Sequence, residues 1–247
     1  MASLESVRNK HNRARSLFDE YNREVVAYYK TEPGEFYIHP DSTETHHMWA
    51  YRTREPIPPQ FALIAGDFLQ CLRSCLDYLV WELVLAAGNE PNKNHMFPIT
   101  MKEKTFQDDL KRGRLAGVDP AAIELIDKLQ PYHLSEADRE RSTLAAINEL
   151  TNVNKHQRIL LTLFATQMFP ELPGNVPGLT AEFRMGPTAD TMTVQAKLLA
   201  FIAFQDGALK GLEVSTCLNN LATYIARDVI SQFSGFFKPK ASQTQAG

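Results

Sequence analysis

Five polar residues in two separate stretches of the chain have the types and spacing of a small chemical site. Arg73 and Asp77 are four positions apart within a strongly apolar stretch. Asn152, Lys155 and His156 recur at helical spacing further along the chain, and so line one side of a helix. If the two helices pack side by side, these residues bring together a carboxylate, an amide, two cations and an imidazole that titrates near neutral pH. Such a cluster can bind an anion or transfer a proton.

Plainer arrangements of the same residues are equally compatible with the sequence. Arg73 and Asp77 can form an ion pair within their own helix at the rim of the core, although Arg at i and Asp at i+4 is the weaker order. Alternatively, all five residues form a buried hydrogen-bonded network that fixes the packing of two helices, since buried polar groups must find partners. The sequence leaves the chemical and the structural interpretations open.

The helices that must position these residues follow from the apolar periodicity of the first two thirds of the chain. A long apolar helix from Gln60 to Ala87 carries the first pair of polar residues. Asp119 followed by Pro120 is typical of a helix start, with Asp as the N-cap and Pro in the first turn. The expected helices are 3–30, 60–87, 102–111, 121–130 and 136–156, with a β-hairpin of strands 35–39 and 46–52 after the first of them.

The rest of the chain has a strand-like composition up to a last amphipathic helix. Residues 158–166 favour a buried strand, although they can also continue the helix before them. The expected strands 180–185, 191–204 and 208–214 form an antiparallel meander, with Gly186-Pro187 and Asp206-Gly207 at its turns. These elements predict one α+β domain over residues 1–237. In it, a helical bundle core (about 60–157) has the antiparallel β meander (about 158–215) packed at one side, followed by a C-terminal helix (about 216–236) and a flexible tail (238–247).

Composition excludes several classes of protein. The 26 basic and 29 acidic residues give a net charge of -3, which indicates neither a general nucleic-acid binder nor a membrane-surface protein. The three cysteines match neither a disulfide framework nor a zinc spacing, and the N-terminus lacks an apolar signal core. We therefore expect a cytoplasmic protein with no membrane partner. Adjacent histidines on a strand point to opposite faces, so His39, His46 and His47 predict no metal site, and no cofactor is expected.

Three segments resemble a widespread group of uncharacterised bacterial proteins that have an arginine-x-x-x-aspartate helix and an asparagine-x-x-lysine-histidine helix. The segments are Gly66-Asp-Phe-Leu-Gln-Cys-Leu-Arg-Ser-Cys-Leu-Asp-Tyr-Leu-Val-Trp81, Leu129-Gln-Pro-Tyr132 and Leu150-Thr-Asn-Val-Asn-Lys-His-Gln-Arg158. The paired motifs are also similar, more distantly, to the HEPN helical-bundle superfamily. Many of its members are metal-independent ribonucleases or RNA-binding partners in toxin-antitoxin and phage-defence systems.

This resemblance implies an RNA-directed protein that binds RNA or cleaves it without a metal. His156 would then act as general acid or base, with Arg73 or Lys155 stabilising the charge of the phosphorane and Asp77 orienting a neighbour. It also implies RNA and a cognate protein as partners, and it is compatible with a homo-oligomer. However, Thr151 stands where the superfamily pattern has an arginine. Either Arg73 supplies that cation from another helix, or the protein is a non-catalytic binding or structural module.

Overall fold

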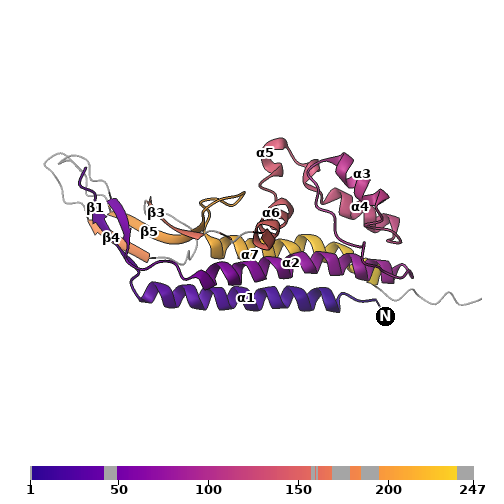
Figure 1. The fold of residues 1–247 in the computed structure, drawn as a ribbon, viewed down its shortest axis with the longest axis horizontal. Helices are drawn as coiled ribbons and strands as arrows, with labels where there is room; N and C mark the ends of the chain where they lie inside the picture. The colour runs from indigo at the N-terminus through magenta and orange to yellow at the C-terminus, as the bar shows by residue number, and fades with distance from the viewer. Residues whose placement is uncertain are drawn as a thin grey trace, which may run out of the picture. The chain divides into compact units, whose positions relative to one another are not determined.

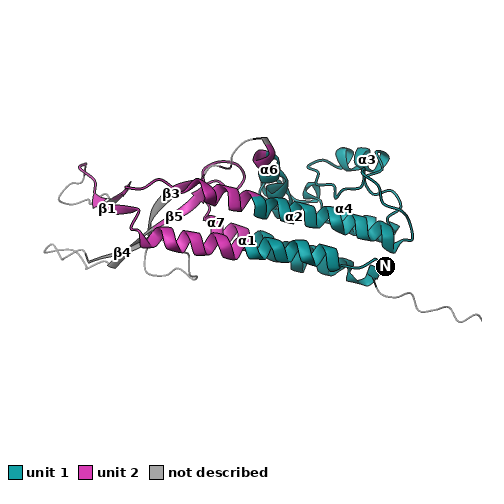
Figure 2. Ribbon diagram, turned by 60° about the horizontal axis from the view of Figure 1, so that its bottom comes forward, with its two compact units in different colours: residues 1–16, 67–152, 220–247 teal, residues 17–66, 153–219 magenta. Residues whose placement is uncertain are grey.

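The computed structural model describes residues 2–41, 49–156, 159, 161–168, 179–184 and 195–237. It divides the chain into two compact units, shown in Figure 2. Unit 1 comprises residues 1–16, 67–152 and 220–247, and unit 2 comprises residues 17–66 and 153–219. The long helices contribute residues to both units.

The described residues form an α+β fold in which helices predominate, as the sequence predicts (Figure 1). No described helix is both long enough and apolar enough to cross a membrane. The α-helices are α1 (Glu5–Lys30), α2 (Pro59–Ala86), α3 (Glu103–Lys111), α4 (Pro120–Lys128), α5 (Glu136–Arg139), α6 (Thr143–His156) and α7 (Val214–Tyr224). The strands are β1 (Gly34–Ile38), β2 (Trp49–Thr53), β3 (Leu161–Met168), β4 (Leu179–Arg184) and β5 (Gln195–Phe204).

The core of unit 1 is built around α2. The helix buries a continuous apolar face because its leucines, phenylalanine and valine recur every three or four residues. Phe97, Phe106 and Ile126, which come from segments after α2, are also fully buried in this unit. Burial of such large apolar groups is the main source of stability for a unit of this size. The α2 residues of unit 1 that are at most 1% exposed include Phe68, Leu69, Leu72, Leu76, Leu79, Val80 and Leu83.

Unit 2 contains both β-sheets. β1 and β2 form an antiparallel hairpin in which Gly34 faces Thr53 and Ile38 faces Trp49, as expected. β3, β4 and β5 form an antiparallel sheet with the order β3-β5-β4. The expected meander places 191–204 between 180–185 and 208–214, so a central β5 beside β4 agrees with it, but β3 lies along the other edge in place of 208–214. β5 holds this position because it pairs with β3 along one edge and β4 along the other.

The helix expected from residue 136 to residue 156 is interrupted. α5 ends at Arg139 and α6 begins at Thr143. The Ser142 hydroxyl donates to the Arg139 carbonyl and accepts from the Ala145 N–H at 3.4 Å. A serine that bonds to the backbone on both sides competes with continued helix, so the chain starts a new helix there.

The strand expected at residues 208–214 is absent from the described chain, and this prediction was wrong. Gly207 and Gly211 have φ of 74° and 76°, which breaks extended backbone into successive turns. The Glu213 carboxylate then accepts hydrogen bonds from the backbone N–H groups of Ser215 and Thr216. Glu213 therefore caps the N-terminus of α7, and the chain enters a helix at Val214.

The C-terminal helix predicted for residues 216–236 is present but changes its winding. α7 continues into a π-helical turn, η2 (Ile225–Val229), and then into a 3-10 helix, η3 (Ile230–Phe237). The expected tail, residues 238–247, lies outside the described residues.

Candidate functional site

Arg73 and Asp77 are brought together on α2 within unit 1. Arg73 Nη2 lies 2.9 Å from Asp77 Oδ1, so the two residues form an ion pair within one helix. Arg73 is 8% exposed, whereas about a third of the Asp77 side chain reaches solvent. Burial lowers the pKa of Arg73, the Asp77 carboxylate opposes this effect, and Arg114 lowers the pKa further. The guanidinium nevertheless stays charged, because the pKa of arginine is far above neutral pH.

The same pair holds the backbone of Phe97. Arg73 Nη2 donates to the Phe97 carbonyl at 2.6 Å, and the Phe97 N–H donates to Asp77 Oδ1 at 2.9 Å. Both backbone polar groups of one buried residue are thus bonded to a single turn of α2. A buried backbone N–H or C=O that lacked a partner would cost about 1–3 kcal/mol. The arrangement therefore fastens an extended segment that has no regular secondary structure of its own.

Further side chains fasten the same segment, residues 92–100. Gln130, which is 1% exposed, accepts from the Thr100 N–H at 3.0 Å and donates to the Ile126 carbonyl at 2.9 Å. His95 Nε2 lies 2.8 Å from the Ala116 carbonyl, and its Nδ1 accepts from the Asn92 N–H at 2.8 Å. Segment 92–100 is consequently held along its length by side chains from α2 and from the region around α4.

Arg114 brings a second guanidinium to this region. Its Nη1 donates to the Asn94 carbonyl at 3.3 Å, and its own carbonyl accepts from the Met96 N–H at 3.3 Å. Arg114 Nε and Arg73 Nη1 are buried without a hydrogen-bond partner among the described residues. The Arg114 guanidinium has the same charge as Arg73, and this repulsion is why Arg114 lowers the pKa of Arg73.

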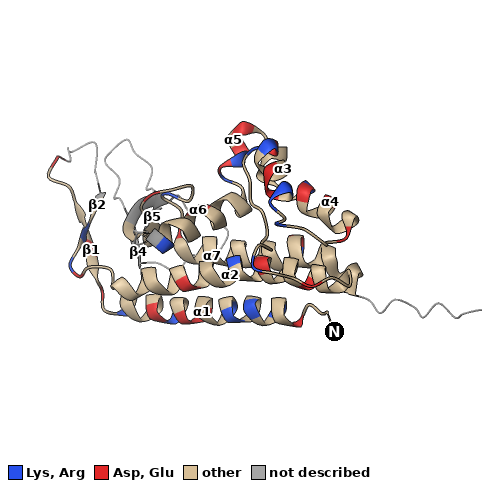
Figure 3. Ribbon diagram, turned by 45° about the vertical axis from the view of Figure 1, so that its right-hand side comes forward, with Lys and Arg blue, Asp and Glu red and all other residues tan. Residues whose placement is uncertain are grey.

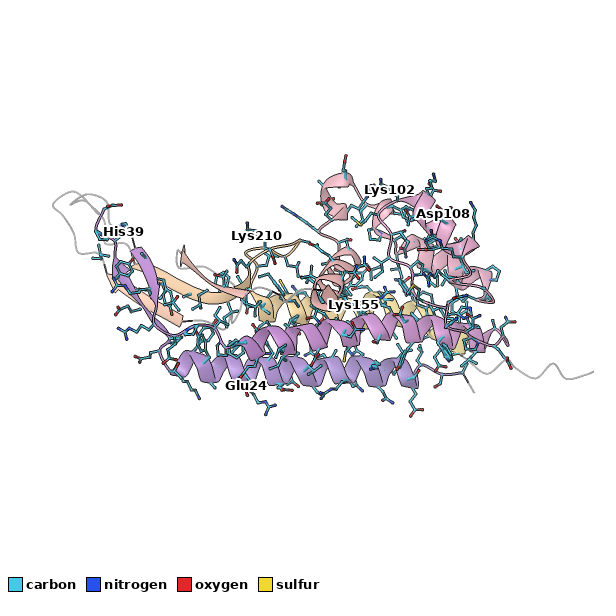
Figure 4. The ribbon with its side chains drawn as sticks, viewed as in Figure 1. Glu24, His39, Lys102, Asp108, Lys155 and Lys210 are labelled. Atoms are coloured by element: carbon cyan, nitrogen blue, oxygen red, sulfur yellow. The ribbon has the colours of Figure 1, made fainter. Side chains whose placement is uncertain are left out.

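The other three candidate residues lie near the C-terminal end of α6. Asn152 belongs to unit 1, and its side chain is exposed. Lys155 and His156 belong to unit 2; the Lys155 side chain is exposed and is labelled in Figure 4. The His156 side chain lies outside the described residues, although its backbone ends α6. The joint cluster of all five residues therefore stays a prediction.

Metal-binding side chains do not gather in the described part of the chain. No group of three or more His, Cys, Asp or Glu residues there could hold a metal ion. His39 bonds locally instead, since its Nδ1 accepts from the Asp41 N–H at 3.2 Å. His46 and His47 lie outside the described residues.

Phe97, Gln130 and Arg114 were not among the candidate residues. Phe97 takes part through its backbone, which gives no signal in the residue type. Gln130 did carry a signal, because it lies within the Leu129-Gln-Pro-Tyr132 segment that contributes to the resemblance. Two of the three resembling segments thus supply side chains that hold segment 92–100.

The chain matches no family model, no curated protein and no solved structure. The similarity to the HEPN superfamily and the function that it implies accordingly stay predictions.

Proposed function

We propose that the protein is a non-catalytic binding module in which Arg73 and Asp77 fix the packing of segment 92–100. The observation that supports this proposal is the double hydrogen bond of the pair to the Phe97 backbone. A general acid or base must reach the proton that it transfers, and a cation must reach the charge that it stabilises. Arg73 cannot turn to a substrate without releasing the Phe97 carbonyl, so its position favours packing over catalysis.

A cleavage assay tests this proposal against the enzymatic alternative. The purified chain and its His156→Ala variant are incubated with a mixed RNA pool in the presence of EDTA. We expect the pool to stay intact with both proteins. Cleavage by the wild type that is lost in His156→Ala would overturn the non-catalytic proposal and favour a metal-independent ribonuclease.

RNA binding without cleavage is the second candidate function. It is favoured by the exposed Asn152 and Lys155 side chains, which lie on α6 within the motif that resembles the HEPN superfamily. An exposed lysine contributes to RNA affinity mainly by neutralising a phosphate and releasing its counterion. RNA bound here would contact Lys155 at a backbone phosphate.

Fluorescence anisotropy with a labelled single-stranded RNA tests this second candidate. Lys155→Gln should weaken binding and reduce the slope of log affinity against log salt concentration by about 1. Lys102→Gln is the matched control, because Lys102 is also exposed but precedes α3. Equal effects of the two variants would reject α6 as the RNA-binding element.

A cytoplasmic location, a cognate protein partner and self-association belong to the same proposal. Light scattering of the purified chain over a range of concentrations would test self-association directly. A molecular mass that stays at 27.9 kDa would reject a stable homo-oligomer.

A further inference from the structure

A hollow of about 210 Å³ lies within unit 1, between the first turns of α1 and the C-terminal segments η2 and η3. Its apolar lining comes from Leu4, Ala226 and Ile230. Leu4 and Ile230 are only 6% and 7% exposed, so they form a fixed floor. Binding of an apolar group in this hollow is favourable because it removes the apolar lining from water.

The polar lining of the hollow comes from one face of α1. Arg8, His11 and Asn12 are at positions i, i+3 and i+4, which places them side by side on the helix. The Arg8 guanidinium and the Asn12 side-chain amide have no hydrogen-bond or ion-pair partner among the described residues. Donors for a ligand are thus present beside the apolar floor.

His11 is held rigidly at this site. Its Nε2 lies 2.9 Å from the Ala222 carbonyl, and because a carbonyl only accepts, Nε2 carries the hydrogen. In the neutral ring, Nδ1 then carries no hydrogen and can accept a hydrogen bond. Ala222 comes shortly before the π-helical turn η2, and such turns occur frequently at functional sites.

The half of α1 that lines the hollow carries more positive than negative charge. Lys10, Arg13 and Arg15 accompany Arg8 in the N-terminal half of α1, where Glu5 is the acidic residue (Figure 3). The hydroxyls of Ser231 and Ser234, which also line the hollow, donate to backbone carbonyls. Their hydrogens are therefore engaged, and Arg8 is the lining group with a full positive charge to offer.

We propose that this hollow binds a small organic anion, with its carboxylate or phosphate group on Arg8 and its apolar part on Leu4 and Ile230. The volume is below the 300–1,000 Å³ that is usual for drug-sized ligands, so the apolar part is no larger than a single ring or a short chain. This inference is independent of the proposed role of Arg73 and Asp77.

Titrations of the full chain followed by two-dimensional NMR test the proposal with defined probes. Benzoate and phenyl phosphate carry both required parts, inorganic phosphate lacks the apolar part, and benzyl alcohol lacks the charge. We expect saturable shifts at residues of α1 and η3 with one or both aromatic anions, with a dissociation constant on the order of 1 mM. Their relative affinities distinguish a carboxylate ligand from a phosphate ligand, while inorganic phosphate and benzyl alcohol should bind at least about tenfold more weakly.

Variants on the two sides of the hollow separate specific binding from general attraction. Arg8→Gln should weaken the aromatic anions about tenfold or more, because a hydrogen bond to a charged group is lost. Arg13→Gln removes an exposed charge of the same helix outside the lining and should have little effect. Ala226→Leu should abolish binding by filling the hollow, and its folding is checked by near-ultraviolet circular dichroism.

The proposal is overturned if neither aromatic anion gives saturable shifts at these residues. It is equally overturned if Arg8→Gln and Arg13→Gln weaken binding to the same extent, since that result indicates diffuse attraction to a basic helix. If Ala226→Leu does not fold, the comparison of Arg8→Gln with Arg13→Gln still tests whether the hollow binds the anion specifically.

Discussion

The Asp77 carboxylate accepts a hydrogen bond from the backbone N–H of Phe97 at 2.9 Å, across 20 positions of the sequence. The same oxygen atom accepts from Arg73, which in turn donates to the Phe97 carbonyl. A charged pair within one helix thereby provides hydrogen-bond partners for both backbone polar groups of a residue in an extended segment. This relationship gives the pair a role in packing, and most of the following predictions depend on it or on the helices around it.

Removal of the Asp77 side chain should destabilise the protein. Asp77→Ala leaves the Phe97 N–H without its acceptor and the buried Arg73 guanidinium without its carboxylate. We expect the free energy of unfolding to fall by about 1–3 kcal/mol, measured by urea denaturation. The control is Asp67→Ala, since Asp67 is exposed on the same helix and in the same unit. If both variants lose the same stability, or if Asp77→Ala is fully stable but no longer binds a ligand, the packing role is wrong.

Gln130 should contribute as much to the free energy of unfolding as Asp77 does, although it carries no charge. Gln130→Ala leaves the buried Thr100 N–H without its acceptor and the Ile126 carbonyl without a donor. The free energy of unfolding should therefore fall by about 1–3 kcal/mol. Gln107 is exposed on α3, and Gln107→Ala should change stability little. Thermal unfolding of the two variants measures the difference. A wild-type melting temperature for Gln130→Ala would contradict the assigned hydrogen bonds.

The buried thiols predict a loss of stability at alkaline pH. Burial raises the pKa of Cys75 to about 12, with a further rise from Cys71, and burial with Glu213 raises the pKa of Cys217 to about 12. The unfolded chain ionises these thiols at about pH 8.5, so it loses protons first as the pH rises. Their contribution is complete below about pH 8.5 and is lost progressively up to about pH 12.

Unfolding measured from about pH 7 to about pH 11 checks the effect of these thiols. The double variant Cys75→Ala and Cys217→Ala should lose less stability over this range than the wild type. Parallel curves for the two proteins would show that the thiols do not ionise differently on folding.

Gly66 should resist substitution even though it lies inside a helix. Glycine to alanine in a helix usually stabilises by up to about 1 kcal/mol. Here, however, a Cβ at Gly66 would overlap the side-chain amide of Asn154 on α6, within unit 2. We expect Gly66→Ala to lower stability by about 1–3 kcal/mol. Gly235→Ala is the control, because a Cβ added at Gly235 would meet no other atom within 4 Å. A stabilised Gly66→Ala protein would refute the close approach.

Much of the fold could be predicted from local sequence signals. Periodic leucines predict α2 within one residue at each end, and the Asp119-Pro120 pair predicts the start of α4, where Asp119 accepts from the Ala121 N–H at 2.8 Å. These predictions succeed because helix caps and apolar periodicity are local signals: they determine the structure of the same few residues that carry them.

The remaining features depend on distant partners or on competition between local structures. The pairing of β3 with β5 joins segments far apart in the chain, and no turn signal specifies it. Glu213 looks like the end of a strand, but its carboxylate caps α7 instead. Similarly, the sequence indicates Arg73 and Asp77 but not their partner, because a backbone N–H and carbonyl are the same at every residue except proline.

Amide hydrogen exchange at Phe97 tests the central claim most directly. In the Asp77→Ala variant, the Phe97 amide should exchange much faster than in the wild type, while the Thr100 amide, held by Gln130, keeps most of its protection. In Gln130→Ala, the Thr100 amide should instead exchange much faster than in the wild type, while the Phe97 amide keeps most of its protection. If the Phe97 amide is as well protected in Asp77→Ala as in the wild type, Asp77 does not fasten segment 92–100, and the account is contradicted.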